Sequence, residues 1–234
     1  MRKDVKSGFL AAAMAFAATP AQAAETVPWM PGKLTGSFSL ASDYLFGGIT
    51  QTNHNATAQG SLDWDTGTGV HLQTFASGVN FGDERTMEME LQGRYHGQAG
   101  KFEYDAAFIY FWYPGGLKSK NHDFWVIYTQ AAYDFGVAKI NTSAYFPDVY
   151  GRIRESAYFI TQVKVPITPQ FDIRVDGGYF IRPNGQKNVT DWNIGGTWKI
   201  PKWFDLDLRY YGCDASFAGT LADNRLIVKI TRSF

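Results

Sequence analysis

The sequence predicts an all-β protein, a transmembrane antiparallel up-and-down β-barrel of about 12 strands. Three observations predict this fold. Apolar and polar residues alternate with a period of two through most of the chain after residue 33. Aromatic residues make up 16% of the sequence, yet no apolar run after the N-terminal segment approaches the roughly 20 residues of a transmembrane helix. Finally, the connections between the predicted strands alternate along the chain between short turns and longer polar loops.

The first residues have the order typical of a secretory signal peptide. Basic residues at the start precede an apolar run over 8–18, and the small residues Ala21 and Ala23 flank Gln22 before a cleavage site. We therefore expect residues 1–23 to be a cleaved signal peptide and 24–33 to be a periplasmic lead. The β-barrel is expected over 34–234, with the bacterial outer membrane as its location.

Each of the first five predicted strands alternates between the two faces of a sheet. In the fifth, Phe102, Tyr104 and Phe108 would face lipid, while Glu103 and Asp105 would face inward. A helix would scatter these carboxylates around its circumference. The five predicted strands span 34–44, 56–65, 70–80, 86–96 and 101–113.

The later strands follow the same rule. Ile173 and Val175 alternate with Arg174 and Asp176 in one of them, so polar and apolar residues separate onto opposite faces. The even total fits a single-chain barrel whose two termini lie at the same rim. The seven later predicted strands span 125–135, 138–146, 153–167, 171–182, 189–200, 204–213 and 224–234.

The last predicted strand ends on Phe234, with Leu226, Val228 and Ile230 at alternate positions before it. This pattern resembles the closing strand of bacterial outer-membrane barrels. The resemblance implies that Phe234 is part of a membrane-assembly signal and that the barrel assembly machinery is a partner of the chain. Arg232 departs from the pattern, and its side chain would extend to the headgroups at the membrane interface.

Connection lengths also differ between the two expected rims. Turns such as 97–100 and 136–137 are short, whereas 47–55, 114–123 and 214–223 are longer and more polar. Short turns are typical of the periplasmic rim and longer loops of the extracellular rim. We expect many aromatic residues near strand ends, Tyr44 among them, to form girdles at the headgroups.

Several blocks of sequence resemble the TorF-family porins of the bacterial outer membrane. They include SDYLFGGITQ at 42–51, ASGVNFGD at 76–83 and YFWYPG at 110–115. The similarity extends over essentially the whole chain after the signal peptide. The family often has an arginine at the position of Gly47, so any role of that arginine in gating or lipopolysaccharide contact is missing here. The resemblance implies a porin-like barrel.

Many ionisable residues fall on the predicted inward face, where they must be hydrated or paired. Acidic residues gather on the fourth and fifth strands, and basic residues on the eighth and ninth. One interpretation is a transverse field across a narrow aqueous constriction; the alternative is a plug of mutual salt bridges. The residues predicted to line a pore are Glu88, Glu90, Arg94, Glu103, Asp105, Arg154, Lys164, Arg174, Arg182 and Arg209.

Composition excludes several other classes of function. The chain without its signal peptide has a small negative net charge, so we expect no nucleic-acid partner. The single cysteine, Cys213, cannot form an intrachain disulfide, and neither cysteine nor histidine spacing indicates a metal site. No cofactor is predicted.

The main prediction for function is passive diffusion of small hydrophilic solutes or ions through a monomeric barrel. A non-transporting structural or receptor barrel, acting through loops 47–55 and 114–123 on lipopolysaccharide, is the alternative. A barrel enzyme acting on lipid is a further alternative, but the sequence shows no serine motif near His71 or His96. We therefore predict no catalytic residues.

Overall fold

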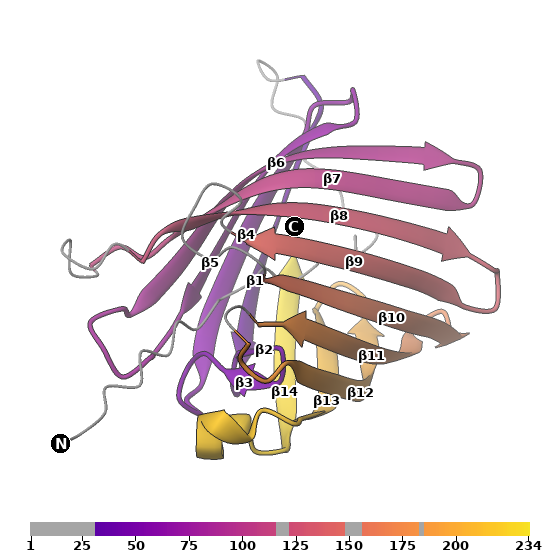
Figure 1. The fold of residues 1–234 in the computed structure, drawn as a ribbon. Coiled ribbons are helices and arrows are strands. Elements are labelled where there is room, and N and C mark those ends of the chain that lie inside the picture. The colour runs from indigo at the N-terminus through magenta and orange to yellow at the C-terminus, as the bar shows by residue number, and fades with distance from the viewer. Residues whose placement is uncertain (1–30, 116–121, 148–155, 183–184) are drawn as a thin grey trace, which may run out of the picture.

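The computed structural model describes residues 31–115, 122–147, 156–182 and 185–234, and these form a closed antiparallel barrel (Figure 1). The predicted all-β barrel is therefore confirmed, with 12 strands in the wall. The predicted signal peptide at 1–23 and most of the lead lie outside the described residues. The wall strands are β1 (Lys33–Ala41), β4 (Thr57–Asp65), β5 (Val70–Gly78), β6 (Met87–Ala99), β7 (Phe102–Trp112), β8 (Phe124–Asp134), β9 (Lys139–Pro147), β10 (Ala157–Thr168), β11 (Phe171–Ile181), β12 (Val189–Ile200), β13 (Phe204–Cys213) and β14 (Arg225–Ser233).

The period of two in the sequence separates the barrel's inner and outer surfaces. Along β7, Phe102 and Phe108 are 42% and 40% exposed, whereas Asp105 and Phe111 are buried. Since successive side chains of a strand point to opposite faces, this alternation continues along the whole strand. Figure 1 shows the strands crossing the wall at a tilt, as the closure of a sheet into a barrel requires.

Large apolar side chains cover the outside of the barrel. Leu40, Leu208 and Ile230, from three different strands, are all more than a third exposed. A belt of this extent is unfavourable in water, and it indicates an apolar medium around the wall. No helix within the described residues has the length and apolar character needed to span a bilayer.

The first and last wall strands close the barrel. β1 pairs with β14 in a register that places Ser37 opposite Ser233. Two further backbone hydrogen bonds join Gly36 and Phe234: Gly36 N donates to Phe234 O at 2.9 Å, and Phe234 N donates to Gly36 O at 3.0 Å. The C-terminal phenylalanine therefore belongs to the closing seam, and this rim, where β1 begins and β14 ends, is the terminal end.

A short hairpin, β2 (Leu45–Phe46) with β3 (Ile49–Thr50), lies at the opposite rim, which we call the hairpin end. Its turn uses Gly47 and Gly48 at φ 54° and 74°, a left-handed conformation that glycine adopts without steric cost. The 3₁₀ helix η2 (Ser216–Ala222) lies at the same rim (Figure 1) and contacts β3.

This hairpin corrects two predictions. Residues 47–55 were expected to form a solvated extracellular loop, but Thr50, Gln51 and Thr52 are buried. Tyr44 was expected in an outer aromatic girdle, and its side chain is instead fully buried. The reason is that strict alternation ends at Ser42, after which the chain turns inward and its polar groups hydrogen-bond one another.

Candidate functional site

A cavity of about 270 Å³ lies inside the barrel, against β1 and β9 to β14. Leu45, Phe46, Gly47 and Gly48 of the hairpin line it at one end, and Ser233 of the seam lines it towards the other. Its wall carries charges of both signs. The basic side chains are Lys164, Arg174, Lys199, Arg209 and Lys229, and the acidic ones are Asp172, Asp176, Asp191, Asp205 and Asp207.

Most charges in this wall pair with a near neighbour. Lys164 Nζ lies 3.1 Å from Asp172 Oδ2 on the adjacent strand. Arg209 donates to Asp207 through both Nε and NH2, at 3.2 and 2.8 Å. Because each partner partly neutralises the other, the wall presents a charge-balanced surface rather than a basic one.

Arg209 is the most deeply buried cation of the wall, at 1% exposure. Its NH1 donates to Asn193 Oδ1 at 3.0 Å and to the backbone oxygen of Arg174 at 3.1 Å. The guanidinium reaches across β12 at Gly195, where a side chain would collide with Arg209 Cβ. Arg209 therefore acts as a structural cross-brace between three strands.

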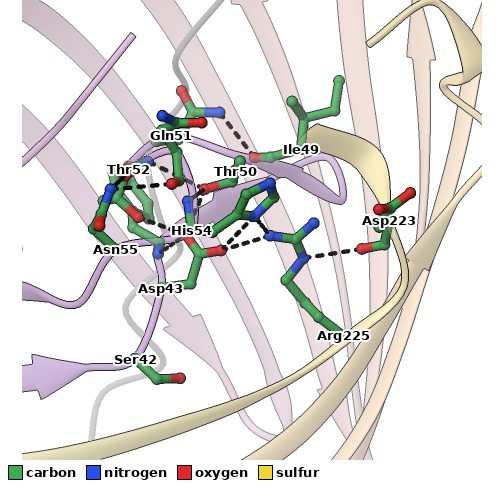
Figure 2. A network of polar contacts seen from close by, with 12 residues as sticks. Ser42, Asp43, Ile49, Thr50, Gln51, Thr52, His54, Asn55, Asp223 and Arg225 are labelled. Atoms are coloured by element: carbon green, nitrogen blue, oxygen red, sulfur yellow. Dashed lines mark hydrogen bonds and ion pairs between the residues drawn. The ribbon is translucent and has the colours of Figure 1, made fainter. Parts of the chain in front are cut away.

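Asp43 anchors the hairpin to the wall. Its Oδ1 accepts hydrogen bonds from the hydroxyls of Thr50 and Thr52, at 2.5 and 2.6 Å. Its Oδ2 lies 2.8 Å from Arg225 NH1 at the start of β14. Figure 2 shows Arg225 contacting Asp43, His54 and Asp223 at once. A buried aspartate thus ties the hairpin, the last strand and the loop before it together.

A second anchor lies on the other side of the hairpin. The hydroxyls of Tyr44 and Tyr113 donate to Glu88 Oε1 and Oε2 at 2.9 and 2.6 Å. Glu88 and Glu90 are both buried, and Glu90 Oε2 accepts a hydrogen bond from Gln92 at 2.9 Å. These two predicted pore-lining carboxylates therefore face the interior, where Glu88 holds Tyr44 in place.

The opposite wall, β6 to β9, is packed with paired groups. Arg94 Nε donates to Asp105 Oδ1 at 2.7 Å, and Gln130 donates to the other oxygen at 2.8 Å. Lys139 Nζ donates to Glu103 Oε2 at 2.6 Å. Arg94, Glu103 and Asp105 thus face inward, and each finds its counter-charge on the same wall.

Apolar side chains fill the lumen beside the hairpin. Phe111 and Phe124 stack with ring centroids 4.6 Å apart, and the Phe46 ring meets Tyr158 edge-on at 4.8 Å. Figure 1 shows the hairpin beside this end of the barrel. The remaining buried members of this cluster are Ala107, Ile109, Tyr113, Val126, Tyr128 and Tyr145.

The structure places one predicted pore residue, Arg182, outside the lumen wall, and leaves another undescribed. Arg154 lies outside the described residues. Arg182 follows β11 at the hairpin end, where its guanidinium covers the ring of Phe217 at 3.8 Å from the ring centroid. Arg182 therefore belongs to the rim and not to the lumen wall, because the chain leaves the sheet at Ile181.

A transverse field was predicted between acidic strands on one side of the barrel and basic strands on the other. The structure instead pairs most of these charges with neighbours in the same wall. Sequence reasoning also missed Tyr44, Tyr113 and Asp191 as interior residues. For Asp191 the signal was present, because it alternates with Thr190 and Trp192 on β12. For Tyr44 no local pattern indicates the inward turn.

Charged groups at the rim and the inward histidines pair with neighbouring carboxylates. In loop 79–86 Arg85 hydrogen-bonds Asp83, and this lowers the pKa of the Asp83 carboxyl. His71 and His96 each lie 3.0 Å from a carboxylate oxygen, of Asp63 and Asp105 respectively. Among the described residues no group of three or more His, Cys, Asp or Glu side chains is placed to hold a metal.

Comparison with solved structures shows which fold this barrel shares. The KdgM porin matches with a TM-score of 0.59 at 10% identity, over 86% of this chain and 99% of that chain. The NanC porin matches with a TM-score of 0.57 at 10% identity, over 86% and 97% of the two chains. At this identity the likeness concerns the fold alone.

Sequence comparison gives the family. No curated protein sequence matches the chain. Membership of the TorF family stays a prediction. The match that covers the chain is to a bacterial family of unknown function, and it includes residues 25–234. The chain therefore belongs to the Gcw_chp family of bacterial proteins of unknown function.

Proposed function

We propose that this protein is an outer-membrane channel for passive diffusion of small hydrophilic solutes. The observation that carries the proposal is the cavity inside the closed barrel, whose wall is polar and charged while the outer surface is apolar. Ionisable groups inside a barrel must be hydrated or paired, and the ion pairs of this wall border a cavity that can hold water or a polar solute. The terminal end of the cavity would face the periplasm.

The size and charge of the cavity favour small solutes over long polyanions. One solved KdgM porin structure is of a complex with disordered oligogalacturonate, a polyanion. Here the cavity wall pairs each of several cations with an aspartate, so it offers no continuous basic track. We infer a channel for short solutes without a strong preference for either sign of net charge.

The hairpin is the element that would control passage. It lines the end of the cavity, and its Thr50 is buried, as are Asp43 and Tyr44 just before it. Solutes could pass only when the hairpin shifts, so we expect a low open probability and short openings. No reaction is proposed, and the barrel is expected to act as a monomer.

The test is single-channel conductance of the refolded protein without residues 1–23, in a planar bilayer under a salt gradient. Discrete openings with weak ion selectivity would support the channel. A correctly folded barrel that stays silent at all voltages would contradict it. The inserted hairpin and packed wall favour the second candidate, a non-transporting barrel acting through its loops, and silence would bring that candidate forward.

A further inference from the structure

Asp191 ends in an unpartnered oxygen at the hairpin end of the cavity. Its side chain is only 4% exposed, and its Oδ1 accepts a hydrogen bond from the Tyr158 hydroxyl at 3.0 Å. Its Oδ2 has no hydrogen-bond partner among the described residues. A buried carboxylate oxygen without a donor is costly, so this atom is suited to receive a donor from a bound solute.

A second carboxylate of the same kind lies close by. Asp176 is 3% exposed, and its Oδ1 accepts no hydrogen bond, although it forms an ion pair with Arg174, whose Nε lies 3.1 Å away. The register places Asp191 opposite Gly178, so Asp176 is its diagonal neighbour on the same face. Diagonal neighbours of this kind are about 7–8 Å apart at Cα, which leaves room for one small group between the two carboxylates.

The hairpin and the aromatic rings complete the surroundings of these carboxylates. A side chain at Gly47 would begin 3.8 Å from Asp191 Oδ2, but glycine supplies none. The rings of Phe46 and Tyr158 line the same cavity. Carboxylates beside aromatic rings are the surroundings that bind an ammonium group, through charge-assisted hydrogen bonds and ring faces.

Basic side chains outnumber acidic ones in the cavity wall farther from the hairpin. Arg174 lies two residues before Asp176 on β11, about 6–7 Å along the strand on the same face. Lys164 is paired opposite Arg174 in the register, and both line the cavity together with Lys229. Asp191 and Asp176 lie at the hairpin end. Farther along the same axis, five basic side chains share the wall with Asp172, Asp205 and Asp207, so an excess of positive charge remains there.

We propose that this cavity binds zwitterionic solutes, with the ammonium group held between Asp191 and Asp176 and the carboxylate held towards Arg174 and Lys164. The inference rests on the proposed function, and it names the class of solute that the channel would admit. A short ω-amino acid has both groups on one flexible chain and suits this axis.

Isothermal titration calorimetry of the refolded barrel in detergent micelles tests the site with three probes of equal chain length. We expect 4-aminobutyrate to bind, butylamine to bind at least fivefold more weakly, and butyrate to give no heat. Equal binding of butyrate and 4-aminobutyrate, or no heat from any probe, would overturn the proposal.

Two variants assign the binding to the predicted atoms. Asp191→Asn keeps an acceptor for the Tyr158 hydroxyl but removes the negative charge, so it should lower the affinity for 4-aminobutyrate at least tenfold. Asp63→Asn changes an inward aspartate that does not line the cavity, and it should leave the affinity within twofold. Gly47→Arg should abolish binding, since its guanidinium would reach Asp191 from the hairpin. Unchanged affinity in Asp191→Asn or in Gly47→Arg would contradict the site.

Conductance of the same proteins separates this proposal from the channel itself. If the wild-type barrel conducts but 4-aminobutyrate does not bind, the site is wrong and the channel stands. If 4-aminobutyrate binds with the expected dependence on Asp191 while the barrel is silent, the site stands as a receptor site and the channel proposal fails.

Discussion

Arg225 NH1 lies 2.8 Å from Asp43 Oδ2, across 182 residues of sequence. This ion pair joins the first residue of β14 to the segment that enters the barrel before the hairpin. Arg225 also donates to the backbone oxygens of Thr220 and Asp223, at 3.0 and 2.9 Å. One guanidinium therefore connects the hairpin, η2 and the last strand.

Removing this ion pair should loosen the hairpin. Asp43 is buried, so Asp43→Asn loses a charge-assisted contact that is worth about 1.5–3 kcal/mol. We expect the open probability in planar bilayers to rise about tenfold or more while the conductance of each opening stays the same. Lys187→Gln, which removes a rim pair 3.5 Å from Asp214, is the control and should behave as wild type. An unchanged open probability in Asp43→Asn would show that the hairpin does not gate passage.

Glu88 should matter chiefly for stability. Glu88→Ala would leave the Tyr44 and Tyr113 hydroxyls buried without an acceptor, so we expect a loss of about 2–5 kcal/mol in the free energy of unfolding. The midpoint of urea unfolding in lipid vesicles measures this. Glu88→Gln keeps the shape of the side chain and one acceptor oxygen, so it should lose less than half as much free energy of unfolding. Equal losses in the two variants would show that the two hydrogen bonds do not account for the effect.

Ion selectivity should depend on the cavity wall and not on the rim. Reversing two charges in Lys164→Glu with Arg174→Glu should move the reversal potential towards cation selectivity, because both side chains line the cavity. Arg182→Glu is the matched control, because Arg182 lies at the rim over Phe217. It should shift the reversal potential far less. A larger shift from Arg182→Glu than from the wall variant would place the selectivity filter in the loops.

Phe234 should affect membrane assembly more than the finished barrel. Phe234→Ala keeps both backbone hydrogen bonds to Gly36 and removes only the ring packed over that glycine. We expect the folded fraction in outer membranes, measured by heat-modifiable gel mobility, to fall severalfold, while refolding of purified protein changes little. Phe38→Ala removes a ring of similar exposure from β1 and serves as the control. Equal assembly of the two variants would count against a terminal assembly signal.

The wall of this barrel could be predicted because alternation is a local property. Asp105 and Phe108 differ in facing simply by their parity along β7, and the sequence displays that parity directly. The hairpin could not be predicted in this way. Burial of Asp43 and Thr50 is favourable only because Arg225 supplies the counter-charge, and nothing near residue 43 shows that this partner is adjacent.

The sequence likewise could not predict that the ion pairs form within each wall of the barrel. Arg94 and Lys139 find Asp105 and Glu103 through the register of neighbouring strands, which is fixed by the turns and the closure of the whole sheet. Arg182 was misplaced for a related reason. The alternating pattern of the sequence extends to Arg182, but the strand ends one residue earlier, at Ile181.

The seam between β1 and β14 also sets the order of events in folding. Ser39 and Thr231, which share a hydrogen bond at 2.9 Å, are 192 residues apart in the chain. Contacts of such long range form slowly, and until they form β1 and β14 each carry an open edge that can pair with another chain. The chain is therefore most prone to aggregate while it is in water before the seam has closed. Whether it avoids aggregation depends on protection of its open edges and on the rate of closure, more than on the stability of the finished barrel.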